Sequence, residues 1–159
     1  MPAGSDGTAA PTELPRTWRP LGARVVAAAA AVALVGTMVF LWLMLPQSVQ
    51  DRFSTLQRAT VIAFLAAMVA VLHALFRTLA RAEAPGLTIV NGYKTRRFEW
   101  AEIVSVSFNP NRPWALLDLA DGDTVVVMAI QNADGARASR SARELAGVIA
   151  EQSRTDRDR

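Results

Sequence analysis

The chain is 159 residues long, enough for one domain of ordinary size, and it has a net charge of +3 and no cysteine. The absence of cysteine excludes disulfides, thiolate catalysis and zinc sites built on cysteine. A net charge this small is compatible with an anionic membrane nearby, but by itself it indicates no function.

Two apolar stretches, residues 25–45 and 59–76, contain no Lys, Arg, Asp or Glu. Each is about as long as the roughly 20 residues that a helix needs to cross the hydrocarbon core of a bilayer. A signal peptide is the alternative for the first stretch, but that stretch exceeds the about 7 to 15 apolar residues of a secretory signal. The sequence therefore predicts a transmembrane hairpin over residues 18–82, with helices at about 22–45 and 58–81.

The positive charges flank this hairpin, whereas the loop between its helices holds only Arg52 and Arg58 against Asp51. The flanking cations are Arg16, Arg19, Arg24, Arg77, Arg81, Lys94, Arg96 and Arg97. By the positive-inside rule, we expect two spans of the plasma membrane with both termini in the cytoplasm. Trp18 and Trp42, near the predicted ends of the first helix, are expected at the membrane interfaces.

Ala66, Ala70 and Ala74 recur every four residues and form a stripe of small side chains on the second helix. We expect this stripe to pack against the first helix, with self-association of two chains as the alternative. His73 is the only histidine in the chain. Neither helix supplies a carboxylate for a proton relay, so we interpret His73 as an interfacial residue that bonds a backbone carbonyl or a headgroup.

Beyond Pro85 and Gly86, which should end any helix continuing from the membrane, apolar and polar residues alternate as in β-strands. The turn-forming pair Asn91-Gly92 predicts a tight hairpin, the first of the sheet. The predicted strands are residues 87–90, the run that ends at Trp100, and residues 104–108, 115–119 and 124–130.

From about Gly135 the apolar residues recur with the period of a helix, which predicts an amphipathic closing helix with Asp134 as its candidate N-cap. The strands and this helix make a small α+β domain over residues 85–152. The polar ends, residues 1–17 and 153–159, are expected to be disordered tails.

This order of elements resembles the short bacterial pleckstrin-homology (PH)-like domains of small actinobacterial membrane proteins. The segments that carry the resemblance are Gly86–Asn91, Arg96–Ile103, Arg112–Trp114, Asp121–Gly122 and Met128–Arg137. The resemblance implies an antiparallel bent sheet of about five strands, fewer than a full PH fold has, with the helix packed over one open end.

Lys94, Arg96 and Arg97 form the densest basic cluster and lie close to the predicted membrane surface. Arginine offers a planar fork of donors to phosphate oxygens, so these residues are candidates for contact with lipid headgroups. A solvated strand face near the membrane is the simpler interpretation. Arg112 and Trp114, in a predicted turn, are candidates for contact with a partner.

The sequence shows no motif of catalysis, and we expect neither an enzyme nor a bound cofactor or metal. Asp118, Asp121 and Asp123 surround a glycine, but their spacing is that of a turn and not of a calcium loop. A basic face interleaved with exposed aromatic residues is missing, so we expect no binding of nucleic acid.

Together these features predict a noncatalytic, membrane-anchored PH-like interaction module on the cytoplasmic face that binds a membrane or cytosolic protein. Sensing of anionic lipid by the basic first hairpin is one alternative. An accessory subunit of a larger transporter or enzyme complex is another, and the transmembrane helices offer a route to homo-oligomers.

Overall fold

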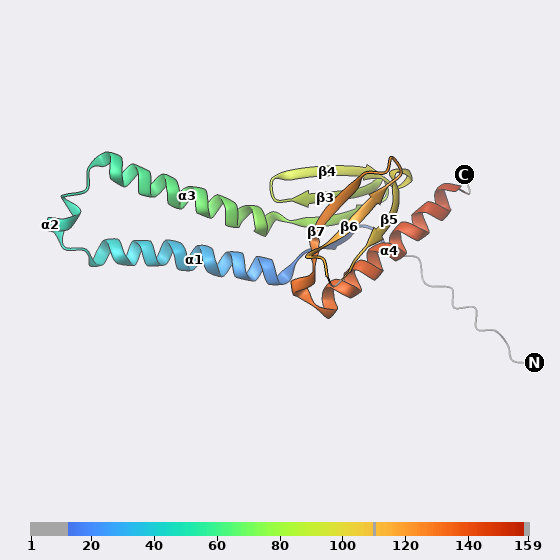
Figure 1. The fold of residues 1–159 in the computed structure, drawn as a ribbon, viewed down its shortest axis with the longest axis horizontal. Helices are drawn as coiled ribbons and strands as arrows, with labels where there is room; N and C mark the ends of the chain where they lie inside the picture. Colours follow the sequence, from blue (N-terminus) through green and yellow to red (C-terminus); the bar gives the residue numbers. More distant parts are fainter. Residues whose placement is uncertain (1–12, 110, 158–159) are drawn as a thin grey trace, which may run out of the picture.

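The computed structural model describes residues 13–109 and 111–157. Two long helices lie side by side at one end of the molecule, and the strands and the closing helix lie at the other (Figure 1). In chain order the elements are β1 (Arg16–Trp18), α1 (Leu21–Met44), α2 (Gln47–Gln50), α3 (Thr55–Arg77), β2 (Leu79–Glu83), β3 (Gly86–Asn91), β4 (Lys94–Glu99), η1 (Trp100–Glu102), β5 (Ile103–Ser107), β6 (Trp114–Leu119), β7 (Thr124–Gln131), η2 (Asn132–Asp134) and α4 (Ala136–Arg157).

The helices α1 and α3 are long and apolar enough to cross a membrane. Their 24 and 23 residues span about 35 Å at about 1.5 Å per residue, against a hydrocarbon core of about 30 Å. Of the residues in these two helices, all of which the structure describes, only Ala27 is buried. A core helix of a water-soluble protein would bury its apolar side chains, so this exposure favours lipid as their environment.

The helical hairpin is inserted between two paired strands of one sheet. β1 pairs antiparallel with β2, with Trp18 opposite Ala80, so the chain leaves the sheet into α1 and returns to it directly from α3. This sheet has the order β1-β2-β3-β4, and a second sheet has the order β5-β6-β7. The hairpin and the sheet domain are therefore joined by two adjacent connections.

The predicted fold class is confirmed, but the described residues hold seven strands in place of about five. β1 lies partly within the predicted disordered tail of residues 1–17, of which residues 1–12 fall outside the described part. β2 occupies residues 79–83, where the second helix was predicted to continue, and α3 ends instead at Arg77. The Leu-Ala-Arg-Ala-Glu sequence of β2 favours a helix locally, and pairing with β1 and β3 overrides that preference.

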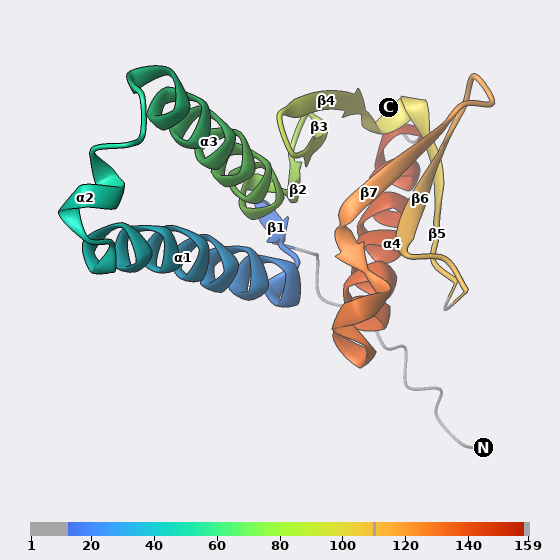
Figure 2. The ribbon, with the colours of Figure 1, turned by 60° about the vertical axis from the view of Figure 1, so that its left-hand side comes forward.

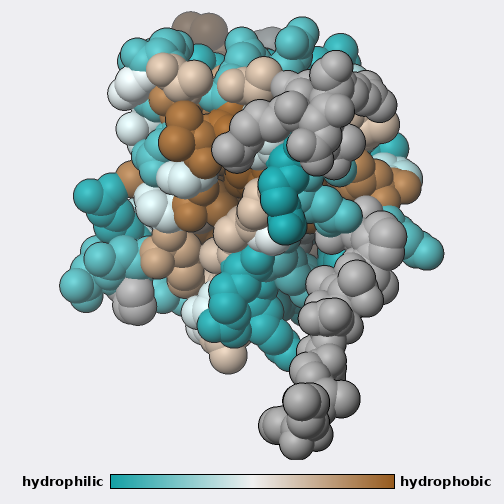
Figure 3. All heavy atoms as spheres, turned by 90° about the vertical axis from the view of Figure 1, so that its right-hand side faces the viewer, coloured by the Kyte–Doolittle hydropathy of each residue, from teal (hydrophilic) through white to brown (hydrophobic). Residues whose placement is uncertain are grey.

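The two sheets and α4 enclose one hydrophobic core, and α4 runs along the β5-β6-β7 sheet (Figure 2). The most deeply buried core side chains include Leu87, Ile89, Leu117, Val127, Ile130, Leu145 and Val148. The face turned away from the hairpin is largely hydrophilic around an apolar area, as expected of a domain in water (Figure 3). The molecule thus has one lipid-compatible half and one water-compatible half.

Two tryptophans that were predicted at membrane interfaces have different environments. Trp18 is 5% exposed in the core of the sheet domain, and its Nε1 donates to Glu144 Oε2 at 3.2 Å. The interfacial prediction for Trp18 is therefore wrong, because β1 carries this residue into the sheet. Trp42 is half-buried at the other end of the hairpin, where its ring makes an edge contact with Phe53 at 5.8 Å between centroids.

The alanine stripe does not form the interface between the two long helices. Ala66 and Ala70 are exposed, whereas the half-buried residues of α3 include Leu65, Val69 and Leu72. Larger apolar side chains therefore make up the covered face of α3. Only Ala74, half-buried beside the β3-β4 turn, is covered, so the expectation that the stripe packs against the first helix is wrong.

The closing helix is longer than predicted. α4 continues to Arg157, into the predicted tail of residues 153–159, whose last two residues lie outside the described part. It begins at Ala136, and Asp134 belongs to the short η2 turn before it. The Asp134 Oδ1 atom accepts a hydrogen bond from the Gly22 backbone N–H of α1 at 3.0 Å. Asp134 therefore caps a helix distant in sequence.

Candidate functional site

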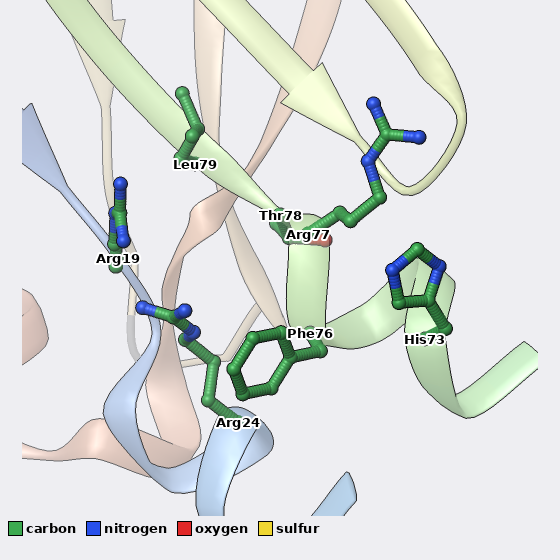
Figure 4. Close-up of a pocket in the computed structure, with 7 residues that line it drawn as sticks. All are labelled: Arg19, Arg24, His73, Phe76, Arg77, Thr78 and Leu79. Atoms are coloured by element: carbon green, nitrogen blue, oxygen red, sulfur yellow. The ribbon is translucent and has the colours of Figure 1, made fainter. Parts of the chain in front are cut away.

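An open cavity lies where the two long helices join the sheet. It has a volume of about 480 Å³. Figure 4 shows the residues that line it, which are Arg19, Arg24, His73, Phe76, Arg77, Thr78 and Leu79. We call this cavity the junction pocket. It combines residues at the start of α1 and at the end of α3 with the first residue of β2.

Local hydrogen bonds fix the walls of the junction pocket. Thr78 is buried between α3 and β2, and its Oγ1 donates to Ala74 O at 3.4 Å and accepts from the Gly92 N–H at 3.3 Å. The Asp134 carboxylate holds the first turn of α1, where a Cβ on Gly22 would lie only 2.7 Å from Asp134 Oδ1. Both helix ends are thus held by the sheet domain.

Three arginines and one histidine line the junction pocket, and no carboxylate does. In the described part of the chain, the salt bridges pair Arg16 with Glu144 and Arg81 with Glu83, so none of the three pocket arginines takes part. The lining of the pocket is therefore positively charged, although the Asp134 carboxylate bonds Gly22 in the first turn of α1.

Arg24 is the residue of the pocket with the most constrained side chain. Its guanidinium lies 4.2 Å from the centroid of the Phe76 ring. Its Nε is buried, and within the described residues it has no hydrogen-bond partner. A buried donor on a charged group is costly to leave unpaired, which marks this atom as a position for an acceptor.

The tip of the β3-β4 hairpin is fastened to α3 beside this pocket. The Tyr93 hydroxyl donates to Ala70 O at 2.9 Å and lies 3.1 Å from His73 Nδ1. Gly92 makes the close approach possible, since its φ of +65° suits glycine and a Cβ there would lie 3.4 Å from Ala74 Cβ. His73 Nδ1 therefore lies within hydrogen-bond distance of a tyrosine hydroxyl, and contact of this residue with a headgroup stays a prediction.

The three residues of the predicted basic cluster, Lys94, Arg96 and Arg97, are all exposed on β4, but they divide between its two faces. Lys94 and Arg96 alternate with Arg97 along the strand, and Arg97 stands opposite Thr88 of β3. The Arg96 guanidinium lies 5.2 Å from the Phe98 ring centroid. This hairpin is also not the first of the sheet, because β1 and β2 precede it.

Arg112 and Trp114 belong to the other sheet and do not join the basic cluster. Arg112 is exposed in the β5-β6 connection, and Trp114 is half-buried opposite Gln131. The Trp100 indole, by contrast, is buried and donates to Glu83 O and Ala84 O at 3.1 Å each. The structure thus separates the two sets of predicted contact residues.

Asp121 and Asp123 lie in the turn between β6 and β7, whereas Asp118 lies in β6 and pairs with β5. Asp121 Oδ1 accepts from the Asp123 N–H at 2.9 Å, and Asp118 Oδ2 accepts from Ser105 Oγ at 2.7 Å. Among the residues that the structure describes, no three His, Asp or Glu side chains gather as metal ligands would.

The junction pocket was missed by reasoning from the sequence. Arg19, Arg24 and Arg77 were interpreted only as cations that set membrane topology, and more than fifty residues separate Arg24 from Arg77. One signal was available, because Arg24 and Arg77 border the two apolar stretches, and the ends of a hairpin's helices meet in space. What the sequence lacked was the pairing of β1 with β2, which brings those ends into one cavity.

Sheets of four and three antiparallel strands, followed by a C-terminal helix, define a PH-like fold. Residues 77–147 match the family described as "Bacterial PH domain", so this part of the chain is similar to bacterial PH domains. PH-like domains are generally noncatalytic, and no enzyme family is indicated. The match confirms the resemblance on which the sequence prediction rested.

Among curated proteins, the chain is similar to the uncharacterized protein Rv1417 of Mycobacterium tuberculosis and the uncharacterized protein Mb1452 of Mycobacterium bovis. Each is 40% identical over 62 residues, which is 39% of this chain. The chain spans 40% of the length of these relatives. No solved structure gives a significant match. The mycobacterial relatives agree with the actinobacterial resemblance.

Proposed function

We propose that this protein is a noncatalytic PH module anchored in the plasma membrane, with both ends cytoplasmic, and that its β3-β4 hairpin contacts anionic lipid headgroups. The observation that supports it most is the hydrogen bond from the Tyr93 hydroxyl to Ala70 O. It ties the hairpin tip to a helix that is apolar enough to span a bilayer.

The position of that bond along α3 sets the depth of the hairpin tip. Ala70 lies seven residues before the end of α3 at Arg77, or about 10 Å along the helix axis. α3 is only about 5 Å longer than the hydrocarbon core, so Ala70 would lie about 5 Å or more inside the core boundary, and the β3-β4 hairpin would cross the headgroup layer to reach it. A tyrosine at this depth, followed by Lys94 and then Arg96, is typical of a membrane interface.

The charge on this hairpin suits an anionic surface. Lys94 and Arg96 are exposed on the same side of β4, and no salt bridge in the described residues uses either. Each cation near a charged membrane contributes on the order of 1 kcal/mol. The cations that flank α1 and α3 favour the cytoplasmic side of the membrane for the sheet domain. The β3-β4 hairpin would contact anionic headgroups on that side.

Amide hydrogen exchange of the full chain in lipid nanodiscs tests this function. We expect exchange over residues 92–97 to be about fivefold slower in discs that contain phosphatidylglycerol than in discs of phosphatidylcholine alone. The difference should shrink as salt is raised, because ions screen exposed charges. The double variant Lys94→Glu with Arg96→Glu should abolish it.

The matched control is Arg143→Glu, which reverses an exposed charge on α4. This control should keep the dependence on phosphatidylglycerol. Equal exchange in the two kinds of disc, or equal loss in the control, would rule out headgroup contact by the β3-β4 hairpin.

A protein partner is the second candidate, and the outer face of the β5-β6-β7 sheet favours it. Trp114, Leu116, Val126 and Met128 are half-buried there, although the opposite side chains of these strands already fill the core. A solvent face of an antiparallel sheet is usually polar. A stoichiometric partner should co-purify with the Arg143→Ala control in mild detergent and should be lost from Trp114→Ser. Recovery of the same partners with both variants would count against this candidate.

A further inference from the structure

We propose that the junction pocket is a binding site for an anionic phosphate group, held by Arg24 and Arg19. This deepens the proposed function, on which it rests for the location of the pocket at the membrane surface. The site itself differs from the β3-β4 hairpin. Its residues come from the β1-α1 connection, from the first turn of α1, from the end of α3 and from the start of β2.

The positive charge of the residues that line the pocket favours binding of an anion. Arg19, Arg24 and Arg77 line one cavity of about 480 Å³ without a carboxylate among the lining residues. Like charges held together raise the free energy of the folded chain, and a bound anion offsets that repulsion. A phosphate provides two or more charge-accepting oxygens on one group, which suits several guanidinium donors at once.

The geometry of Arg24 singles out this residue as the main contact. Its guanidinium Cζ lies over the Phe76 ring, 4.2 Å from the ring centroid. Contact with the ring through one face does not use the N–H donors, which lie at the edge of the guanidinium plane. The buried Nε belongs to that edge and has no partner among the described residues. A shift of the side chain that uncovers the Nε would let it and a terminal nitrogen bind a phosphate in bidentate fashion.

Figure 4 shows that different residues lie on the two sides of the Phe76 ring. Arg24 extends toward Arg19 on one side of the ring, and Arg77 and His73 lie on the other side. Arg77 is engaged there by the Tyr93 ring at 5.5 Å, and His73 by the Tyr93 hydroxyl. The phosphate site is therefore assigned to the side of Arg19 and Arg24.

Thermal unfolding of the full-length protein in mild detergent tests the site. The probe is dioctanoyl phosphatidic acid, and dioctanoylglycerol, which has the same acyl chains and no phosphate, is its matched control. Ligand that binds only the folded protein raises the unfolding temperature in a saturable way. We expect stabilisation by the phosphatidic acid and none that saturates with dioctanoylglycerol.

Variants at Arg24 locate the effect. Arg24→Gln should weaken the apparent affinity for phosphatidic acid about tenfold or more, the effect of losing a hydrogen bond to a charged group. Arg24→Lys keeps the charge but loses the fork, so an intermediate loss is expected and a folded protein is retained. Arg58→Gln is the matched control, since Arg58 also stacks on an aromatic ring, Trp42, at the other end of the hairpin.

Equal responses of Arg24→Gln and Arg58→Gln would overturn the proposal, as would equal stabilisation by the two acyl probes. Inorganic phosphate distinguishes the source of the ligand. Stabilisation by millimolar phosphate that depends on Arg24 would identify a soluble phosphate compound, and stabilisation by phosphatidic acid alone would identify a lipid headgroup.

The experiments can disprove the phosphate site and the headgroup contact of the β3-β4 hairpin independently of each other. One outcome is that the double variant Lys94→Glu with Arg96→Glu leaves the lipid dependence of amide exchange unchanged while Arg24→Gln abolishes binding of phosphatidic acid. That result would support the phosphate site and rule out headgroup contact by the β3-β4 hairpin. The reverse pattern leaves the hairpin function and removes the pocket.

Discussion

At each end of the helical hairpin an arginine lies over an aromatic ring, but the two arginines differ in their hydrogen bonds. At the loop end, the Arg58 guanidinium lies 5.3 Å from the Trp42 ring and its Nη2 donates to Gln50 O at 2.7 Å. At the sheet end, the Arg24 guanidinium lies 4.2 Å from the Phe76 ring, and its buried Nε has no partner among the described residues. One arginine is satisfied by its neighbours and the other is not.

The caps of the two helices show the same contrast. Ser54 begins α3 with a capping box, in which its side chain and that of Gln57 each bond the other's backbone N–H. α1 has no side-chain cap from its own N-cap residue, and Asp134 supplies one from 112 residues away. The loop end is therefore built from local contacts, whereas the sheet end depends on the PH domain and holds the cavity.

The largest expected difference between the two ends is all-or-none labelling by a membrane-impermeant maleimide on intact cells. The chain has no cysteine, so single reporters are specific. Ser48→Cys, exposed in α2, should be labelled from outside. Ala120→Cys, exposed in the β6-β7 turn, should be labelled only after permeabilisation, since positive flanks remain in the cytoplasm. Labelling of Ala120→Cys on intact cells would reverse the proposed orientation.

The next effect concerns stability. Trp18→Ala should destabilise the PH domain by about 3–5 kcal/mol, because it empties a core position and removes the bond to Glu144. Trp42→Ala at the loop end should cost less than about 1 kcal/mol, because lipid replaces much of its contact. The unfolding temperature and protease sensitivity of the full chain in detergent measure both. Equal costs would show that the two ends are equally dependent on packing.

The smallest effect separates the two caps. Asp134→Ala and Ser54→Ala should each cost about 0.5–2 kcal/mol, the usual range for a lost cap. Their locations should differ: Asp134→Ala should speed amide exchange at residues 21–24, and Ser54→Ala at residues 55–58. Unchanged exchange at the start of α1 in Asp134→Ala would show that Pro20 and the β1 pairing alone hold that end.

Much of the fold was predictable because its signals are local. The Asn91-Gly92 turn and the alternation in β3, β5, β6 and β7 follow from the preferences of neighbouring residues, and the structure confirms these elements. β1 and β2 escaped prediction because each is short or helix-favouring in sequence and is a strand only through its partner. Trp18 was misplaced for the same reason, since its burial follows from β1.

The candidate site was less predictable than the fold. Lys94 and Arg96 are visible in the sequence as a basic cluster, but Arg97 lies on the other face of β4, which only the strand register shows. Arg24 resembles any cation at the start of an apolar helix. Its stacking on Phe76 joins residues that are 52 positions apart, and no local pattern encodes that contact.

The sequence by itself determined that this chain has two helices long and apolar enough for a bilayer, followed by a small β-rich domain with a closing amphipathic helix. Hydrophobic length and periodicity are properties of consecutive residues, so they survive without knowledge of the fold. Only the tertiary structure decided that the hairpin is inserted between β1 and β2, and that three arginines meet in one cavity. Strand pairing across a long insertion depends on contacts between distant residues, and those contacts set where the charges converge.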